Sequence, residues 1–231
     1  MKVSFSSFNI SNCFNHSKIL YPRLSEERFY SYVQKKTVSF GEKDKVVVQS
    51  YKPKKLEVLF TEQQIQNRIK TLSKEINDFY GNQPIVMVSV MKGALPFAVD
   101  LSKRLNMPVK MEFVRLSSRA GSRMPTGKIK EVDMNLPDLD GKNVLIVDDI
   151  VGTGLTGKHV FDYINQKFDT KSTKFCAFIN KRAVREYDFE PDFVGFNIDN
   201  DKRFVLGYGL DDKEYCRNLP FVGYDEFDIQ A

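Results

Sequence analysis

The segment that most constrains the fold runs from Asn143 to Val160 and reads NVLIVDDIVGTGLTGKHV. Its short apolar run is typical of a strand buried on both faces of a parallel sheet. Two adjacent acids, Asp148 and Asp149, end that run. A turn rich in glycine and threonine follows and leads into a helical pattern. A strand, a turn and a helix in this order indicate an α/β protein.

The same alternation extends from Leu59 to the last part of the chain. A helix is predicted after Thr61, a suitable N-cap, and it is expected to end at Gly81. Its apolar positions recur at steps of three and four residues: Ile65, Ile69, Leu72, Ile76 and Phe79. Further strands are predicted in IVMVSV, VKMEFVRLSS, STKFCAFINKRA, PDFVGFNI and RFVLGYGLDD. Strands that alternate with helices predict a parallel α/β sheet.

Composition excludes several classes of protein. The 231 residues are 42% hydrophobic, which is enough for a core, but the longest apolar runs are far too short to cross a bilayer. The three cysteines lack a CxxC spacing, which argues against a disulfide framework and a zinc site. Residues 1–57 hold 11 Lys/Arg and 5 Asp/Glu, leaving 24 and 25 for the remainder. The body is therefore nearly neutral, and nucleic-acid binding is not expected.

Residues 1–57 differ from the rest of the chain and are interpreted as an N-terminal extension, with one domain over 58–231. No acid precedes Glu26, and serine is frequent. That composition is typical of an organelle transit peptide, and the alternative is an irregular extension or a divergent N-terminal arm. The stretch YKPKK, residues 51–55, is interpreted as a linker because Pro53 and three lysines disfavour packing.

The turn after the two acids has the composition of a phosphate-binding loop. Its glycines allow close approach of the backbone, and its threonines add hydroxyl donors: Gly152, Thr153, Gly154, Thr156 and Gly157. Successive N–H groups at a helix N-terminus bind a phosphate. The turn is not a P-loop because no Gly-Lys-Ser/Thr follows at the required spacing.

Two carboxylates beside such a turn would repel a phosphate. Asp148 and Asp149 are explained if they accept hydrogen bonds from sugar hydroxyls beyond the phosphate, or support a Mg²⁺ ion. A ribose 5-phosphate with free 2′ and 3′ hydroxyls meets both demands. The alternative is an ordinary helix start with an incidental acidic pair.

VLIVDDIVGTGLT resembles the 5-phosphoribosyl-1-pyrophosphate (PRPP) signature of type I phosphoribosyltransferases. More narrowly, the chain from about Leu59 to Tyr224 resembles hypoxanthine-guanine phosphoribosyltransferases, through VSVMKGALPFAVDL, EFVRLSS, FINKR, PDFVGF and RFVLGYGLDDKEYCRNLP. The resemblance implies a central parallel sheet flanked by helices, with a small hood. It also implies PRPP and a 6-oxopurine as substrates, Mg²⁺ as cofactor, and a homodimer or homotetramer. The cytoplasm is the expected location, or an organelle if residues 1–57 contain a transit peptide.

The resemblance assigns the PRPP site residue by residue. Asp148 and Asp149 would hold the ribose hydroxyls, and Asp148 would also serve Mg²⁺. The 5-phosphate would be held by Thr153, Gly154 and Thr156. Lys92, Gly93 and Arg217 would meet the pyrophosphate, and the peptide bond before Lys92 is often cis in this family. Asp211 would hold Mg²⁺, directly or through water, unless Asp211 and Asp212 form only a turn.

The resemblance also assigns a purine site. Lys181 would donate to the purine O6 and so select a 6-oxo base, although it could be a solvated surface lysine. Phe204 would stack on the purine, and the backbone of Val205 would contact its edge. Phe204 could equally be part of the core. The loop after Ser118 matches the position of the family's mobile cover, which would exclude water from the reaction.

Two positions depart from the family pattern. Gly152 stands where the family usually has an acid that manages the proton of the purine N7, and glycine cannot transfer a proton. Arg119 replaces the tyrosine of a Ser-Tyr pair in the cover loop, and it could still reach pyrophosphate. Three hypotheses follow: a working 6-oxopurine enzyme, a non-catalytic binder of PRPP or nucleotide that has a regulatory role, or a phosphoribosyltransferase for another base.

Overall fold

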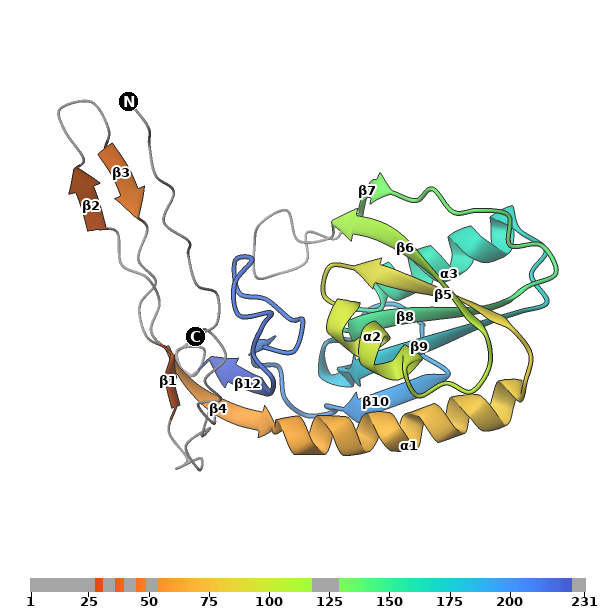
Figure 1. Cartoon of the computed structure of the whole chain (residues 1–231), viewed down its shortest axis with the longest axis horizontal. Coiled ribbons are helices and arrows are strands. Elements are labelled where there is room, and N and C mark those ends of the chain that lie inside the picture. The colour runs from red at the N-terminus through yellow and green to blue at the C-terminus, as the bar shows by residue number, and fades with distance from the viewer. Residues whose placement is uncertain (1–27, 31–35, 40–44, 49–53, 118–128, 226–231) are drawn as a thin grey trace, which may run out of the picture.

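The computed structural model describes residues 28–30, 36–39, 45–48, 54–117 and 129–225. A six-stranded sheet with the order β10-β9-β8-β5-β6-β7 forms its centre (Figure 1). All neighbours are parallel except β7, which runs antiparallel to β6. The strands are β5 (Ile85–Met91), β6 (Val109–Ser117), β7 (Lys130–Asp133), β8 (Asn143–Val151), β9 (Ser172–Asn180) and β10 (Phe193–Asn197). The predicted parallel α/β sheet is confirmed.

Apolar side chains cover both faces of the central strands, because successive residues of a strand point to opposite sides. Met87 and Leu145 pack on one face with α1 (Glu62–Tyr80) and α2 (Leu95–Ser102). Val88 and Ile146 pack on the other face with α3 (Leu155–Lys167). The continuous apolar runs in the sequence therefore reflect burial on both faces.

Helix α1 begins as predicted, with the side chain of Thr61 accepting a hydrogen bond from the backbone N–H of Gln64 in a capping box. Most of its predicted apolar face is fully buried, but the placement of Phe79 in that face is wrong. Phe79 is 51% exposed, and Tyr80 is buried instead. The Tyr80 hydroxyl donates to the carbonyl of Val144 in β8, 3.3 Å away. The last residue of α1, Tyr80, therefore connects the helix to the sheet, and Phe79 does not.

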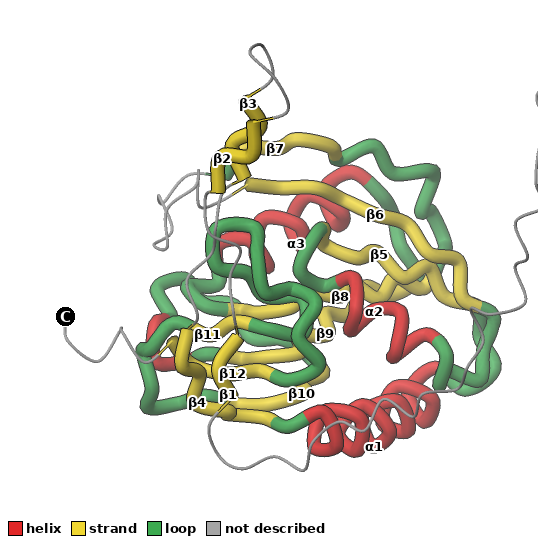
Figure 2. Tube along the Cα trace, turned by 60° about the vertical axis from the view of Figure 1, so that its left-hand side comes forward, coloured by secondary structure: helices red, strands yellow, loops and turns green. Residues whose placement is uncertain are grey.

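A second, antiparallel sheet forms the hood and has the order β1-β4-β12-β11. It lies beside β9 and β10 (Figure 2). Its strands are β1 (Arg28–Tyr30), β4 (Lys54–Phe60), β11 (Val205–Leu206) and β12 (Val222–Asp225). Two further strands, β2 (Lys36–Ser39) and β3 (Lys45–Val48), form an antiparallel pair.

Strand β4 crosses the predicted boundary between residues 57 and 58, and that boundary remains a prediction. The strand also takes in Lys54 and Lys55, the last two residues of the predicted linker, while residues 51–53 lie outside the described part. In the described part of the chain, no helix combines the length and the apolar character needed to cross a membrane.

Candidate active site

The turn predicted to bind phosphate joins β8 to α3 at the carboxyl edge of the sheet. Gly154 precedes α3 with a φ of +91°, and a Cβ there would lie 3.0 Å from the carbonyl oxygen of Tyr187. The Thr153 carbonyl accepts hydrogen bonds from the backbone N–H groups of Glu186, at 3.0 Å, and Tyr187, at 2.9 Å. Glycine is therefore required at position 154, and the turn is tied to the segment that follows β9.

An arginine that the sequence did not single out supports the same turn. The Arg185 guanidinium donates to the carbonyl of Gly152 at 2.9 Å and to the side-chain oxygen of Asn180. Burial lowers the pKa of Arg185. A Cβ at Gly152 would lie 3.7 Å from a side-chain carbon of Val184, which is an ordinary contact, so this position has room for a Cβ. The structure places Thr156 in the first turn of α3, partly exposed.

Asp149, the second of the two acids, lies against the turn after β5. Asp148 is buried, whereas Asp149 is partly exposed and accepts the N–H of Ile150 at 2.9 Å. A Cβ on Gly93 would lie 1.7 Å from Oδ2 of Asp149, and a Cβ on Gly209 would lie 2.0 Å from the carbonyl oxygen of Gly93. Two glycines therefore allow Asp149, the β5 turn and the loop between β11 and β12 to approach one another closely.

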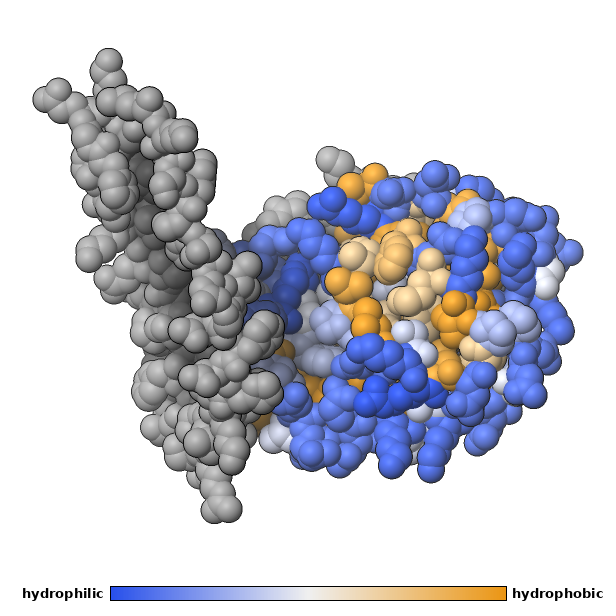
Figure 3. Space-filling view, viewed as in Figure 1, coloured by the Kyte–Doolittle hydropathy of each residue, from blue (hydrophilic) through white to orange (hydrophobic). Residues whose placement is uncertain are grey.

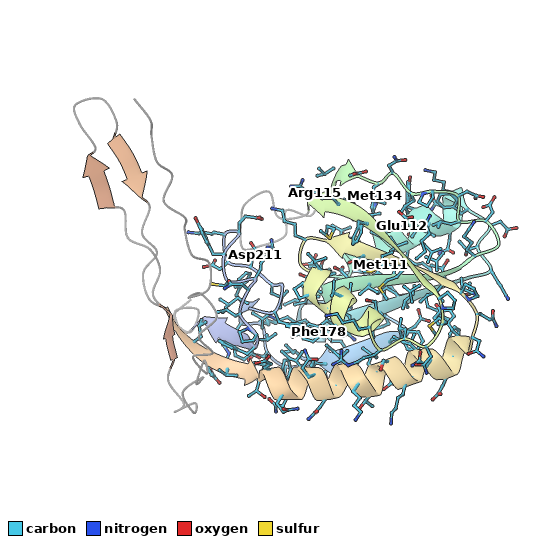
Figure 4. All side chains as sticks on the ribbon, viewed as in Figure 1. Met111, Glu112, Arg115, Met134, Phe178 and Asp211 are labelled. Atoms are coloured by element: carbon cyan, nitrogen blue, oxygen red, sulfur yellow. The ribbon has the colours of Figure 1, made fainter. Side chains whose placement is uncertain are left out.

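Three of the predicted PRPP-binding and metal residues lie together in one charged cluster. Lys92, which follows a cis peptide bond from Met91, pairs with Glu214 at 2.5 Å. Arg217 pairs with Asp211 at 3.0 Å and with Glu214 at 3.3 Å. The hydrogen bond from Lys92 lowers the pKa of Glu214. Figure 4 labels Asp211 in this loop, on the side that faces the ends of the parallel strands.

The predicted purine residues lie between β9 and the hood. Lys181 is only 5% exposed, so the surface-lysine alternative is wrong. Its ammonium donates to the carbonyl of Arg203, and its backbone N–H donates to Val151 at 2.9 Å. Phe204 is partly buried and packs against the apolar residues of the hood, and Val205 begins β11. Lys181 thus links the phosphate turn to the segment that precedes Phe204.

An ion-pair network holds that segment and was not anticipated from the sequence. Arg203 pairs with Asp201 at 2.8 Å and with Glu57 of β4 at 2.5 Å, and its guanidinium lies 3.7 Å from the ring centre of Tyr224. Hydrogen bonds from Arg203 lower the pKa of Asp201 to about 2. Arg203 lies in a charged run that is typical of a surface turn, so the sequence did not indicate a role for it in the site. Arg119 lies outside the described residues.

The fold and this arrangement define a class of protein. Residues 57–213 match the family model described as "Phosphoribosyl transferase domain", and the chain belongs to that family.

Relatives of the chain are named more specifically, as hypoxanthine-guanine phosphoribosyltransferases. The chain is 44% identical over 171 residues to the hypoxanthine-guanine phosphoribosyltransferase of Aquifex aeolicus, covering 73% of this chain and 94% of the relative. It is 35% identical over 166 residues to the enzyme of that name from Bacillus subtilis, covering 72% and 91%.

Solved structures agree with this relationship. A hypoxanthine phosphoribosyltransferase from Staphylococcus aureus superposes with a TM-score of 0.69 at 33% identity, covering 76% of this chain and 94% of its own. A structure titled as the alanine mutant in an analysis of an invariant aspartic acid in HPRTs superposes with a TM-score of 0.67 at 34% identity, covering 75% and 97%. The predicted type I phosphoribosyltransferase fold is confirmed.

Proposed function

We propose that this protein acts in purine salvage by transferring the 5-phosphoribosyl group of PRPP to a 6-oxopurine, which gives a nucleoside monophosphate and pyrophosphate. The observation that carries the proposal is the buried Lys181, joined to the phosphate turn through Val151 and to the hood through Arg203. A buried ammonium binds favourably to a base that has an oxo group as hydrogen-bond acceptor. It disfavours the amino group of adenine, which would leave a buried donor unpaired.

The β8 turn and its acids would bind the ribose phosphate. In the proposal, Asp148 and Asp149 accept hydrogen bonds from the ribose hydroxyls. The 5-phosphate is held by Thr153, Gly154 and Thr156. The anchoring of the Thr153 carbonyl supports this assignment, because it orients the turn before any ligand arrives.

Lys92, Gly93 and Arg217 would bind the pyrophosphate. Mg²⁺ commonly binds to one or two carboxylates together with substrate phosphates, and Asp211 and Asp148 would supply these carboxylates. Within the residues that the structure describes, no group of three or more His, Cys, Asp or Glu side chains could hold a metal alone. This donor set fits an ion that arrives with PRPP. When bound, Mg²⁺ would neutralise charge on the departing pyrophosphate.

The reaction breaks the bond from C1′ to a pyrophosphate oxygen, forms a bond from C1′ to a base nitrogen, and releases one proton from the base. The protein holds the reactants in line and stabilises the developing charge. Gly152 provides no carboxylate to accept this proton, so in the proposed reaction the proton goes to water. Loss of such a group costs about 10²–10⁴-fold in rate. Xanthine, which is more acidic than hypoxanthine, depends less on a protein base. Arg119 is proposed to contact pyrophosphate.

The full chain, assayed with PRPP, Mg²⁺ and hypoxanthine, guanine or xanthine, tests the proposal. Formation of a 6-oxopurine nucleotide is the expected result. Gly152→Asp should accelerate it by supplying a proton acceptor at a position that has room for a Cβ. Turnover only in Gly152→Asp would favour the non-catalytic binder, and turnover only with another base would favour the third hypothesis. If neither protein forms a nucleotide with any base, the proposed purine site is contradicted.

We further propose a homodimer or homotetramer. Apolar side chains gather on the face over α2 and β6 (Figure 3), where Leu95 and Phe113 are 39% and 44% exposed. A second copy of the chain would cover them. Light scattering should show a dimer or tetramer, and Phe113→Glu should reduce its mass. An unchanged monomer in both proteins would contradict this.

The proposed location is the cytoplasm. An organelle is the alternative if residues 1–57 contain a transit peptide. A fluorescent fusion at the C-terminus distinguishes the two, because only a transit peptide would concentrate the fluorescence in an organelle and shorten the protein.

A further inference from the structure

The carboxylate of Glu214 lies between two cations that the proposed function assigns to pyrophosphate. Oε2 of Glu214 is 2.5 Å from Nζ of Lys92, and Oε1 is 3.3 Å from the guanidinium of Arg217. Lysine and arginine bind carboxylate and phosphate oxygens with the same kind of charge-assisted hydrogen bond. Glu214 therefore occupies the hydrogen-bonding positions that a pyrophosphate oxygen requires.

The loop is built to keep this carboxylate in place. The backbone N–H of Glu214 donates to Oδ2 of Asp211 at 2.8 Å. Lys213, Glu214 and Cys216 have φ values of +51°, +70° and +68°, which residues other than glycine seldom adopt. A strained backbone persists only where the surrounding structure holds it, and such positions gather at functional sites. From this backbone the Glu214 carboxylate reaches Lys92, the residue directly after β5.

Lys92, Glu214 and Arg217 form an ion-pair bridge, and the two cations at its ends are also positioned by other contacts. Arg217 is held by Asp211 at 3.0 Å and by the carbonyl of Gly209 at 2.7 Å. Lys92 lies in the turn after β5, beside Gly93, whose carbonyl contacts Gly209. The bridge therefore joins two loops that must both reach the pyrophosphate. Because Glu214 is 62% exposed, its carboxylate can turn into water when a stronger anion arrives.

We propose that Glu214 is an internal competitor of pyrophosphate. It holds Lys92 and Arg217 in position, and it gives them up when the pyrophosphate end of PRPP binds. It takes them back as the product leaves. This lowers the affinity for PRPP and for product pyrophosphate, and it speeds product release. The proposal rests on the assignment of Lys92 and Arg217 to pyrophosphate.

The full chain and Glu214→Gln should be compared by calorimetric titration with magnesium pyrophosphate and by the KM for PRPP. The glutamine variant should bind pyrophosphate about fivefold more tightly, since screening limits exposed charge pairs, and its KM for PRPP should fall similarly. Glu75→Gln is the matched control, because Glu75 also pairs with an arginine, Arg68, at 2.7 Å and is not part of the site. It should change neither value.

The outcomes separate this proposal from the one it rests on. Lys92→Gln should weaken pyrophosphate binding if the site is correctly assigned. If it does so while Glu214→Gln binds with unchanged affinity, Glu214 is only a surface ion pair. If Glu214→Gln binds more weakly, Glu214 assists Mg²⁺ or pyrophosphate rather than competing. Either result overturns the proposal that Glu214 competes with pyrophosphate, and leaves the assignment of Lys92 to pyrophosphate intact. Unchanged binding by Lys92→Gln overturns both assignments.

Discussion

Replacement of Gly93 by alanine should damage PRPP use far more than it damages the fold. The new Cβ would lie 1.7 Å from Oδ2 of Asp149 and 2.5 Å from its Cγ. The carboxylate must therefore move by about 2 Å to reach an ordinary contact distance. That movement breaks its hydrogen bond with the N–H of Ile150, at 2.9 Å, and displaces the proposed ribose ligand.

The two consequences differ in size. Loss of one hydrogen bond and an unfavourable rotamer lower the free energy of unfolding by about 1–2 kcal/mol, or about 2–8 °C in Tm for a domain of this size. A misplacement of about 1 Å in a reacting geometry costs about 10²-fold in rate. We therefore expect kcat/KM for PRPP to fall by about 10²-fold in Gly93→Ala, measured by initial rates at varied PRPP, with a modest loss of Tm.

Gly195→Ala is the matched control with the opposite balance. Its Cβ would lie 2.3 Å from the carbonyl oxygen of Phe178, so the collision is with backbone in β9 rather than with a movable side chain. Tm should fall further than in Gly93→Ala, while the KM for PRPP should change less. If Gly93→Ala keeps its KM and rate within about threefold of the wild type, Asp149 is not a ribose ligand held against Gly93.

Three further predictions follow from the structure. Asp201→Asn should lower Tm near neutral pH, and the difference from the wild type should disappear as pH falls from 3.8 through about 2, because a lowered carboxylate pKa stabilises only above that range; a pH-independent difference would contradict this. Phe178→Ala, which removes a fully buried ring beside Phe97 and Tyr208, should cost about 3–5 kcal/mol in urea unfolding. Asp211→Asn should raise the Mg²⁺ concentration for half-maximal rate severalfold, and an unchanged requirement would remove Asp211 from the metal site.

Local patterns predicted the central sheet well, because its strands are apolar on both faces and its long helix has a clear period. The error at Phe79 arose because a step of three residues was taken after Ile76, whereas the buried residue lies four residues on, at Tyr80. The chain turns at Gly81, and Tyr80 reaches the sheet instead. Strand β7 escaped detection because its sequence, KEVD, has no apolar run.

The hood was harder to predict because its pairing is non-local. Strand β4 hydrogen-bonds with β12, so that Leu56 lies opposite Asp225. Short strands whose partners lie far along the chain leave little periodic signal. The candidate site residues were predicted from the family motif, whereas Glu214, Arg185 and Arg203 were not. Each belongs to a charged run in the sequence, and only the tertiary structure shows which charge faces which loop.

The pairing of β4 with β12 has a consequence for synthesis. Contacts between distant residues form late, because closing a long loop costs entropy before the contact stabilises the chain. On the ribosome, β5, β8 and β9 emerge before β12 does, so we expect the phosphate turn to become ordered while the purine side of the site is still open. Pulsed hydrogen exchange during refolding should then protect the amides of β8 before those of β11 and β12. Simultaneous protection would show instead that the two sheets fold as one unit.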